Sequence, residues 1–447
     1  MALTSARRRL WFGAWSTLLV NILITSCHGN SHGPVTLDYL RTGLVPLSEQ
    51  AAFDSMSDTF FKQTGRKLRI LGGVQEDTRD QLDLTRTLFH QRGSDPDVLQ
   101  IDVTWLGVLH DDLLDLKPYF GSVNGHFTGP ASPYAVGDKI LALPEYVNGG
   151  MLAYRSDLLR KYGYSSPPRT WDELESMAKR IQNGERRGGN PSFWGYVWPG
   201  AAVESLTCNA LEWQMSDGGG SIIERDSIIS VNNPFASHAW ERAKHWIGRI
   251  SPPSTTAYKE DDVQQAFGAG RAAFARVWGG ELEPAPQGRN TVILHYAGNH
   301  FPNAAQVSFT TLPAGNCASV SVLGGSGLAV SRYSSHPSEG AELIRFLEHA
   351  EPLMYQDGIS PDPATDAVAY ALEAPPTNCM GTKNVDNHWM ISRPSTIAGR
   401  SYDQVSGAYF EAVHSVLTGE VTAPSAAAKL EAALVKITGF HARPVQH

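Results

Sequence analysis

The chain has 447 residues, of which 42% are hydrophobic and 18% charged, and its formal net charge is -8. This length predicts two or three domains, and the apolar fraction excludes a disordered chain. The acidic balance argues against a nucleic-acid binder, and four cysteines are too few for a disulfide-stapled miniprotein or a multi-cysteine metal scaffold.

The N-terminal segment is typical of a bacterial signal peptide. Three arginines at 7–9 precede an apolar stretch at 10–24, which is shorter than a typical membrane-spanning helix. The stretch leads into Ile-Thr-Ser-Cys, which resembles a lipobox. We therefore expect removal of residues 1–26, lipidation of Cys27 and an extracytoplasmic protein held at the membrane by its lipid. An ordinary signal peptide with a chance cysteine, or an N-terminal anchor helix, is the alternative.

The next part of the chain has the pattern of an α/β domain. Strand-like runs at 67–71 and 98–103 flank a helix-like segment at 77–90 with leucines near helical spacing. This strand-helix-strand order predicts a parallel sheet. A further strand is expected at 139–143, followed by a glycine-containing break at 144–150.

Helix starts are marked further along the chain. Thr170 and Glu173 form a capping-box pattern, and we expect that helix to end at Gly184. Asn233 and Pro234 open another helix. Three later helices are expected at 342–349, 402–417 and 426–437.

Four stretches in order resemble one known family. They are 95–106 (Asp-Pro-Asp-Val-Leu-Gln-Ile-Asp-Val-Thr-Trp-Leu), 142–174 with its Leu-Ala-Tyr-Arg-Ser-Asp-Leu-Leu core, 267–278 (Phe-Gly-Ala-Gly-Arg-Ala-Ala-Phe leading to Trp), and 323–331 (Leu-Gly-Gly-Ser-Gly-Leu-Ala-Val-Ser). The family is the extracellular solute-binding proteins, family 1, of ABC importers. The four stretches occur in the order and at the spacing of that family, across nearly the whole mature chain.

Within that family the chain most resembles trehalose/maltose-binding proteins. The stretches that carry this are 190–198 (Asn-Pro-Ser-Phe-Trp-Gly-Tyr-Val-Trp), 204–208 (Glu-Ser-Leu-Thr-Cys) and 250–253 (Ile-Ser-Pro-Pro). The resemblance implies a two-lobed periplasmic-binding-protein fold, type II-like, with two discontinuous α/β lobes joined by a hinge and a sugar bound in the cleft between them.

The resemblance also implies where the lobes divide. The N-terminal lobe would comprise 36–143 plus 323–355, and the C-terminal lobe 149–318 plus 390–447. The chain would cross near 144–149 and 319–323, and again near 355–390.

A sugar site needs polar side chains for hydroxyl groups and flat aromatics for the sugar faces. The resemblance places such contacts on nine residues: Glu49, Gln81, Asp102, Tyr146, Asn148, Trp278, Gly325, Ser326 and Arg393. Two of them depart from the family pattern. Ser326 stands where the resembled proteins carry a stacking Trp, and Asn148 where some carry Asp, so the identity of the sugar is less defined than its class.

Structural roles are the alternative for several of these residues. Trp278 has the pattern of either a ligand platform or a core residue, whereas Trp105 and Trp171 are expected in the core. Asp102 and Glu49 can instead cap or charge a helix start. Arg393 can instead form an ion pair at the surface.

The chain lacks the motifs of common enzymes. It has no His-Glu-x-x-His, no P-loop, no nucleophile elbow and no Gly-x-Gly-x-x-Gly, so we expect no catalytic residues, no metal and no cofactor. The favoured function is that of a monomeric sugar-binding component that delivers its ligand to the permease subunits of an ABC importer. The alternatives are a secreted glycoside hydrolase, which also uses carboxylates and aromatics, and a same-fold binder of a polyol or a glycerol phosphodiester, although the acidic chain offers no basic surplus for the latter.

The cysteines after Cys27 divide into two kinds. Cys317 and Cys379 lie in loop-like sequence, where an oxidising compartment allows a disulfide between them. Cys208 lies in an apolar helical stretch and is expected to be a buried free thiol.

Overall fold

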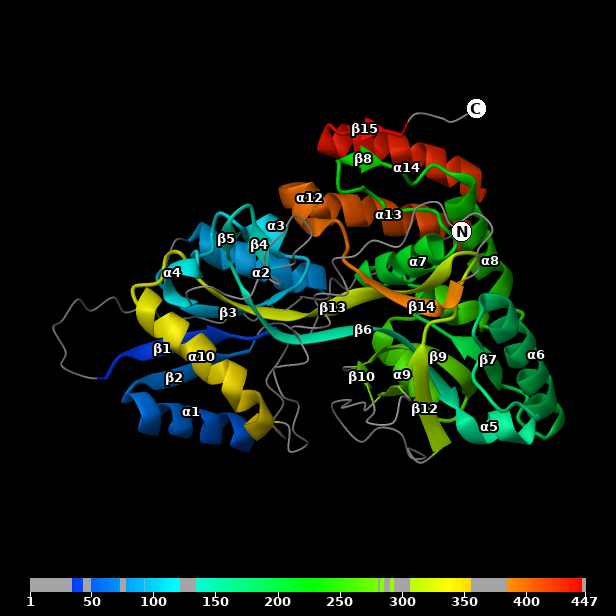
Figure 1. The fold of residues 1–447 in the computed structure, drawn as a ribbon, viewed down its shortest axis with the longest axis horizontal. Helices are drawn as coiled ribbons and strands as arrows, with labels where there is room; N and C mark the ends of the chain where they lie inside the picture. The colour runs from blue at the N-terminus through cyan, green and yellow to red at the C-terminus, as the bar shows by residue number, and fades with distance from the viewer. Residues whose placement is uncertain are drawn as a thin grey trace, which may run out of the picture. The chain divides into compact units, whose positions relative to one another are not determined.

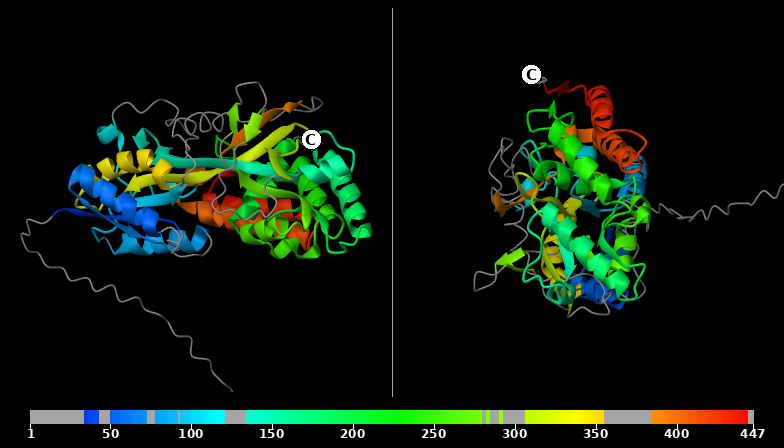
Figure 2. Two further views of the ribbon diagram at one scale, coloured as in Figure 1. Left: turned by 90° about the horizontal axis from the view of Figure 1, so that it is seen from below. Right: turned by 90° about the vertical axis from the view of Figure 1, so that its right-hand side faces the viewer.

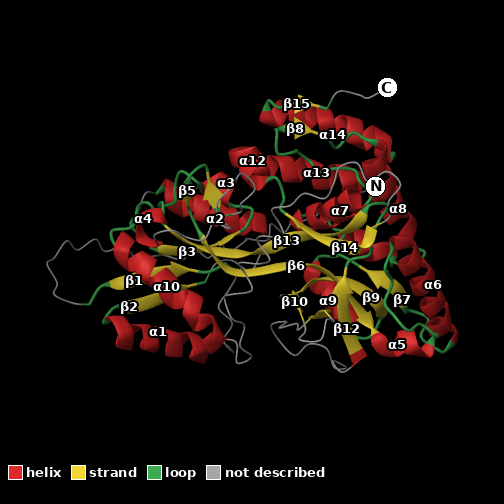
Figure 3. Ribbon diagram, viewed as in Figure 1, coloured by secondary structure: helices red, strands yellow, loops and turns green. Residues whose placement is uncertain are grey.

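The computed structural model describes residues 34–42, 50–72, 78–91, 93–120, 134–279, 282–284, 290–292, 306–354 and 384–443. Residues 36–447 group into one compact unit, in which helices and strands alternate (Figures 1 and 3). No helix in these ranges is long and apolar enough to cross a membrane.

One mixed sheet organises this unit. Its strands follow the order β2-β1-β3-β13-β6-β9-β7, with β12 added to β6 and β14 added to β13. Their bounds are β1 (Thr36–Leu40), β2 (Lys67–Leu71), β3 (Val98–Asp102), β6 (Leu143–Arg155), β7 (Trp194–Val197), β9 (Ala272–Gly279), β12 (Val307–Thr311), β13 (Ala318–Val330) and β14 (Asn384–Ile391). The β1–β2 and β1–β3 pairs are parallel, as the strand-helix-strand pattern predicted.

Two long strands, β6 and β13, connect the two ends of the sheet (Figure 1). The N-terminal half of β6 pairs antiparallel with the middle part of β13. The C-terminal part of β13 then pairs with β3, whereas the C-terminal part of β6 pairs with β9 and β12. Each strand therefore contributes to both ends without an intervening loop.

Helices cover the sheet at both ends. The longer ones are α1 (Gln50–Thr64), α2 (Thr78–His90), α6 (Trp171–Arg187), α7 (Glu204–Ser216), α8 (Pro234–Trp246), α9 (Glu260–Gly268), α10 (Pro337–Met354), α13 (Tyr402–Leu417) and α14 (Ala423–Thr438). The shorter ones are α3 (Leu106–Leu109), α4 (Lys117–Phe120), α5 (Ser156–Lys161), α12 (Ser395–Ala398) and the 3-10 turns η2 (Pro253–Ala257) and η4 (Gly399–Ser401). Helix α13 packs on α7, α8 and α14. In both views of Figure 2 the orange and red C-terminal helices lie against green segments of the chain.

Three small two-stranded sheets accompany the main sheet in the described part of the chain. They pair β4 (Ala135–Val136) with β5 (Lys139–Ile140), β8 (Ile228–Ile229) with β15 (His441–Ala442), and β10 (Leu282–Pro284) with β11 (Asn290–Val292).

The apolar core falls into separate clusters. One surrounds β3 and α3 and includes Trp105, which is 2% exposed. A larger one is built around tryptophans of α6, α7 and α8, in which Trp246 lies 5.4 Å from Trp171 and 5.8 Å from Trp213 between ring centroids. Trp171 is also 2% exposed, so the prediction that Trp105 and Trp171 are core residues is confirmed.

The helix signals are mostly confirmed. The Thr170 hydroxyl accepts a hydrogen bond from the Glu173 amide at 3.2 Å, and Asn233 caps α8 through the amides of Phe235 and Ala236. The expected end at Gly184 is wrong, because α6 continues to Arg187. A side chain at Gly184 would overlap the Tyr162 ring, so this glycine provides close packing and not a helix stop.

The break expected after residue 143 is also wrong. Residues 144–150 lie within β6, where they pair with β13. The glycines in this segment mark close packing inside a strand, because a side chain at Gly150 would overlap the Glu212 carboxylate.

Candidate functional site

The sheet register brings together candidate residues that are far apart in the sequence. Ser326 of β13 pairs with Asp102 of β3 on one side and with Tyr146 of β6 on the other. Adjacent strands lie about 4.8 Å apart, so the backbones of Asp102 and Tyr146 are separated by roughly 10 Å. This spacing across three strands is comparable with the length of a small sugar.

Two further candidates lie next to this row. Asn148 pairs with Gly324, and Gly150 pairs with Trp278 of β9. A Cβ atom on Gly324 would overlap Asn148 Oδ1 and would lie 2.7 Å from Trp278 Cζ3. The amide and the indole therefore both lie over this glycine, where only a residue without a side chain fits.

The side chains in this group differ in how they are engaged. Tyr146 is 41% exposed. The buried Oδ1 atom of Asn148 has no hydrogen-bond partner among the described residues. A buried acceptor without a donor is costly, so Asn148 Oδ1 keeps an unused hydrogen-bonding capacity next to Gly324 and Trp278.

Trp278 is partly buried against the larger core cluster. Its Nε1 donates to Glu260 Oε1 at 2.6 Å, and the guanidinium carbon of Arg276 lies 4.0 Å from the centroid of its ring. The indole is thus held at one edge and covered on one face.

Ser326 is buried and bonded within the protein. It is 2% exposed, and its hydroxyl donates to Glu145 Oε2 at 2.6 Å, which also accepts from Gln100. The neighbouring Gly325 has a φ of +117°, and a side chain there would overlap the Tyr146 carbonyl. In this structure Ser326 therefore links β13 to β6 and leaves no aromatic surface at its position.

Arg393 joins the row from the segment after β14. It is 6% exposed, and its Nη1 lies 2.8 Å from Glu204 Oε1, whereas its Nη2 lies 3.9 Å from Asp102 Oδ1. Burial alone would lower the pKa of Arg393, but nearby acidic groups, Asp102 and Glu204 among them, outweigh it and hold the pKa well above its usual value. Arg393 is therefore a permanent buried cation, and the surface ion-pair alternative does not describe it.

Asp102 has a local bond as well. Its Oδ1 accepts from the Thr104 amide at 2.8 Å and from the Thr104 hydroxyl at 2.6 Å. It does not cap α3, whose N-cap residue Trp105 makes no side-chain cap bond. Its carboxylate thus faces both the turn after β3 and the Arg393 guanidinium.

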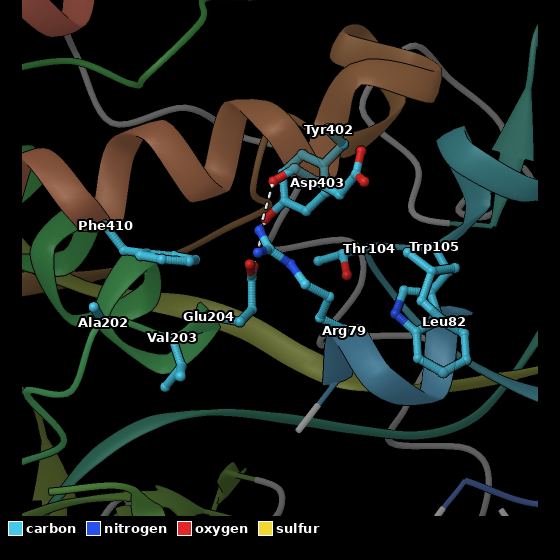
Figure 4. Close-up of a pocket in the computed structure, with 10 residues that line it drawn as sticks. All are labelled: Arg79, Leu82, Thr104, Trp105, Ala202, Val203, Glu204, Tyr402, Asp403 and Phe410. Atoms are coloured by element: carbon cyan, nitrogen blue, oxygen red, sulfur yellow. Dashed lines mark hydrogen bonds between the residues drawn. The ribbon is translucent and has the colours of Figure 1, made fainter. Parts of the chain in front are cut away.

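A small pocket adjoins these residues (Figure 4). It is lined from α2, the turn after β3, the start of α7 and α13, by residues that include Arg79, Thr104, Trp105, Glu204, Tyr402 and Phe410. Glu204 accepts from the Tyr402 hydroxyl at 2.6 Å, and Arg79 donates to the Asp403 carbonyl at 3.2 Å. Burial and then the charge of Glu204 raise the pKa of Tyr402 well above its usual value, so its hydroxyl stays protonated.

Gln81 lies on α2 between Arg79 and Leu82, both of which line this pocket. The pocket has a volume of about 80 Å³, which is smaller than the roughly 300–1,000 Å³ of typical ligand pockets. Glu49 and Cys27 lie outside the described residues. No group of three or more His, Cys, Asp or Glu residues in the described part of the chain is arranged to hold a metal ion.

Sequence reasoning missed three acidic or basic residues of this region. Glu204 was noted only as part of a family-like stretch, and Glu212 and Arg276 were not singled out. Arg276 lies in an otherwise apolar strand and Glu212 in a wholly buried part of α7. A charged residue within an apolar segment signals a buried partner, and that signal was available in the sequence.

The chain matches the model of a family described as bacterial extracellular solute-binding protein over residues 48–352. It is 37% identical over 396 residues to a protein of Deinococcus radiodurans named "Probable ABC transporter-binding protein", and the match covers 86% of this chain and 89% of that one.

Solved structures give a consistent result. The maltose-bound MalE3 protein of T. maritima has a TM-score of 0.70 and 28% identity, over 89% of this chain and 98% of that one. A solute-binding protein of Thermotoga lettingae bound to alpha-D-tagatose has a TM-score of 0.69 and 19% identity, over 91% and 100% of the two chains, and shows likeness of fold alone. These proteins have the two-lobed α/β fold, which confirms the predicted fold class.

Proposed function

Because the chain belongs to the bacterial extracellular solute-binding protein family, we propose that it captures a sugar between its two lobes and delivers it to the permease of an ABC importer. It is a binding protein and not an enzyme, since its family and its relatives bind solutes, and the glycoside hydrolase alternative is therefore set aside.

The observation that carries the proposal is the convergence of polar and aromatic side chains on β3, β13, β6 and β9. Tyr146 is exposed, Asn148 has an unfilled acceptor, and Trp278 offers an indole beside it. Asp102 and Arg393 add a carboxylate and a guanidinium at the other end of the row. Hydroxyl-binding groups next to an aromatic face are what a sugar requires.

We propose a disaccharide such as maltose or trehalose as the ligand. The likeness to the maltose-bound T. maritima protein supports this class. The lobes would comprise 36–143 with 323–355 and 149–318 with 390–447, which places Asp102 in the first lobe and Trp278 and Arg393 in the second. Ser326 removes a stacking surface from one end, so we expect fewer aromatic contacts to one of the two rings.

The experiment is thermal unfolding with maltose, trehalose, ribitol, mannitol and glycerophosphocholine, followed by calorimetry of each compound that raises the melting temperature. A ligand that binds only the folded state raises it. We expect a disaccharide to give the largest rise. A rise with a polyol or with the phosphodiester alone would replace the disaccharide by that class, and no rise with any sugar would contradict the proposal.

We further propose that the mature protein is a monomer, tethered at the cell surface or in the periplasm by a lipid on Cys27. The family is extracellular, which agrees with an exported protein. The lipobox-like sequence and the polar residues after it support the tether.

A further inference from the structure

A buried ion pair lies directly beneath the candidate sugar platform. Arg276 of β9 and Glu212 of α7 are each 1% exposed in their side chains, with 2.7 Å between Nη2 and Oε1 and 3.2 Å between Nε and Oε2. A pair this deeply buried usually contributes little net stability, because both charges lose their hydration. Its position in the fold suggests a role other than stability.

The Arg276 guanidinium packs against one face of the Trp278 indole. The two residues are two positions apart on β9, so their side chains leave the same face of the strand. The guanidinium carbon lies 4.0 Å from the centroid of the indole, which is the geometry of a cation–π contact. One face of Trp278 is therefore occupied by Arg276 and is closed to a sugar ring.

Glu212 connects the same point to the crossing strands. Its Oε1 also accepts from the Val322 amide of β13 at 3.1 Å, and it lies so close to Gly150 of β6 that a side chain there would overlap it. The residue after Val322 is Leu323, whose carbonyl accepts from Arg393 Nη2 at 3.3 Å. The carboxylate thus joins β6, β9 and β13 where they carry the candidate site.

Helix α7 holds two arginines of this region in the same manner. Glu204 at its start binds Arg393, and Glu212 farther along binds Arg276. A shift of α7 would move both the guanidinium next to Asp102 and the support of Trp278.

We infer that the Arg276–Glu212 pair is a positioning element of the binding site, which fixes the plane of the Trp278 indole and determines which of its faces a ligand can use. This inference rests on the proposed sugar-binding function. Neither residue touches the ligand; both act through Trp278.

The first test reads the indole without any sugar. The protein is labelled with 5-fluorotryptophan, and the Trp278 resonance is identified by its absence in Trp278→Phe. In the doubly neutral variant Glu212→Gln, Arg276→Met, which leaves no unpaired buried charge, we expect that resonance to shift or broaden in the folded protein. An unchanged Trp278 resonance would overturn the inference whatever the ligand is.

The second test is a double-mutant cycle on affinity for maltose and trehalose. The doubly neutral variant should bind the preferred sugar at least about fivefold more weakly. In a Trp278→Ala background the same double change should have no further effect, because its action passes through the indole. An equal loss in both backgrounds, or no loss in either, would contradict the positioning role.

A matched control separates positioning from general loss of a buried pair. Asp217, which is buried, forms another ion pair with the partly buried Arg242 at 2.8 Å, and Arg242 lies 5.7 Å from the centroid of the Trp171 ring in the core. The variant Asp217→Asn, Arg242→Met should leave sugar affinity unchanged. If this control weakens binding as much as the test variant does, the effect is general and the inference fails.

If the parent protein binds neither disaccharide while the fluorine test succeeds, the proposed sugar is wrong and the support of Trp278 by Arg276 stands.

Discussion

Arg86 of α2 forms an ion pair with Asp403 of α13, with 3.1 Å between Nη1 and Oδ2. The two helices belong to different predicted lobes, so this pair connects segments that closure of the lobes would bring together. Asp403 and Asp83 both bind the same guanidinium, but Asp83 lies on α2 itself.

We expect Asp403→Asn to weaken disaccharide binding by up to about fivefold, because a partly exposed ion pair contributes about 0.2–1 kcal/mol. The effect should be larger at low salt than at high salt. Calorimetric titration at two salt concentrations measures it. Asp83→Asn is the control and should leave affinity unchanged; equal effects of the two variants would show that the contact between helices has no role in binding.

Trp278→Ala should weaken sugar binding about 30-fold or more, since a hot-spot aromatic is worth about 2–4 kcal/mol. Because the indole is only partly buried, we expect the protein to remain folded with a modestly lower melting temperature. Affinity and melting temperature are measured on the same variant, with Trp278→Phe as a graded control. A large fall in melting temperature with unchanged affinity would place Trp278 in the core and remove it from the site.

We expect the buried His388 of β14 to make the folded protein less stable in acid. Its Nδ1 lies 2.8 Å from Ser319 Oγ, and burial lowers the pKa of His388 from 6.5 to about 4. The unfolded chain therefore binds a proton below pH 6.5 that the folded protein does not, so the free energy of unfolding falls as the pH drops through this window and the loss is complete near pH 4.

The loss should reach up to about 3 kcal/mol, at roughly 1.4 kcal/mol for each pKa unit. Urea unfolding across this pH range measures it. In His388→Gln the difference between neutral and acid stability should shrink by that amount. Parallel pH profiles for the parent and His388→Gln would contradict the assignment.

Cys317 is disulfide-bonded and Cys208 is a buried free thiol, which confirms the expectation for Cys208. Burial raises the pKa of the Cys208 thiol to about 12, so we expect it to resist alkylation in the folded protein. Cys379 lies outside the described residues, and its pairing with Cys317 stays a prediction.

Peptide mapping without reduction should find the peptides of Cys317 and Cys379 linked. Reducing this bond should lower the free energy of unfolding by about 2–5 kcal/mol. A link from Cys317 to the peptide of Cys27 would overturn both this pairing and the lipid anchor, because a lipidated thiol cannot form a disulfide.

Cys27→Ala should abolish lipidation and normal processing of the signal peptide. Labelling with a radioactive fatty acid and fractionation of membranes measure both effects, with Cys208→Ala as the control that retains the lipid. A Cys27→Ala protein that still takes up the label, or is processed like the parent, would show that the anchor lies elsewhere.

Local signals in the sequence predicted local structure well. Asn233 and Pro234 start α8 where expected, because the cap and the fixed φ of proline act within a few residues. Gly184 misled the prediction, since its role is set by the ring of Tyr162, which directly follows the separate helix α5. A glycine's packing partner cannot be seen in a window of neighbouring residues.

The candidate site was predicted as a set of residues but not as an arrangement. That Ser326 lies between Asp102 and Tyr146 follows from strand register, which depends on pairings across more than 170 residues of sequence. The contact of Arg276 with Trp278 could have been suggested by their spacing on one strand. The bond of Arg393 to Glu204 could not have been suggested by the sequence, because it joins two segments that meet only in the folded chain.

The central pairing of β6 with β13 has a consequence for how the protein is made. The β1–β3 end of the sheet is completed by residues 326–330, so a nascent chain that has reached residue 317 still lacks the strand that joins β3 to β6. Contacts this distant in sequence form late and slowly. The sheet therefore cannot be completed until more than two thirds of the polypeptide has been synthesised, so its first strands wait for partners that come much later in the chain.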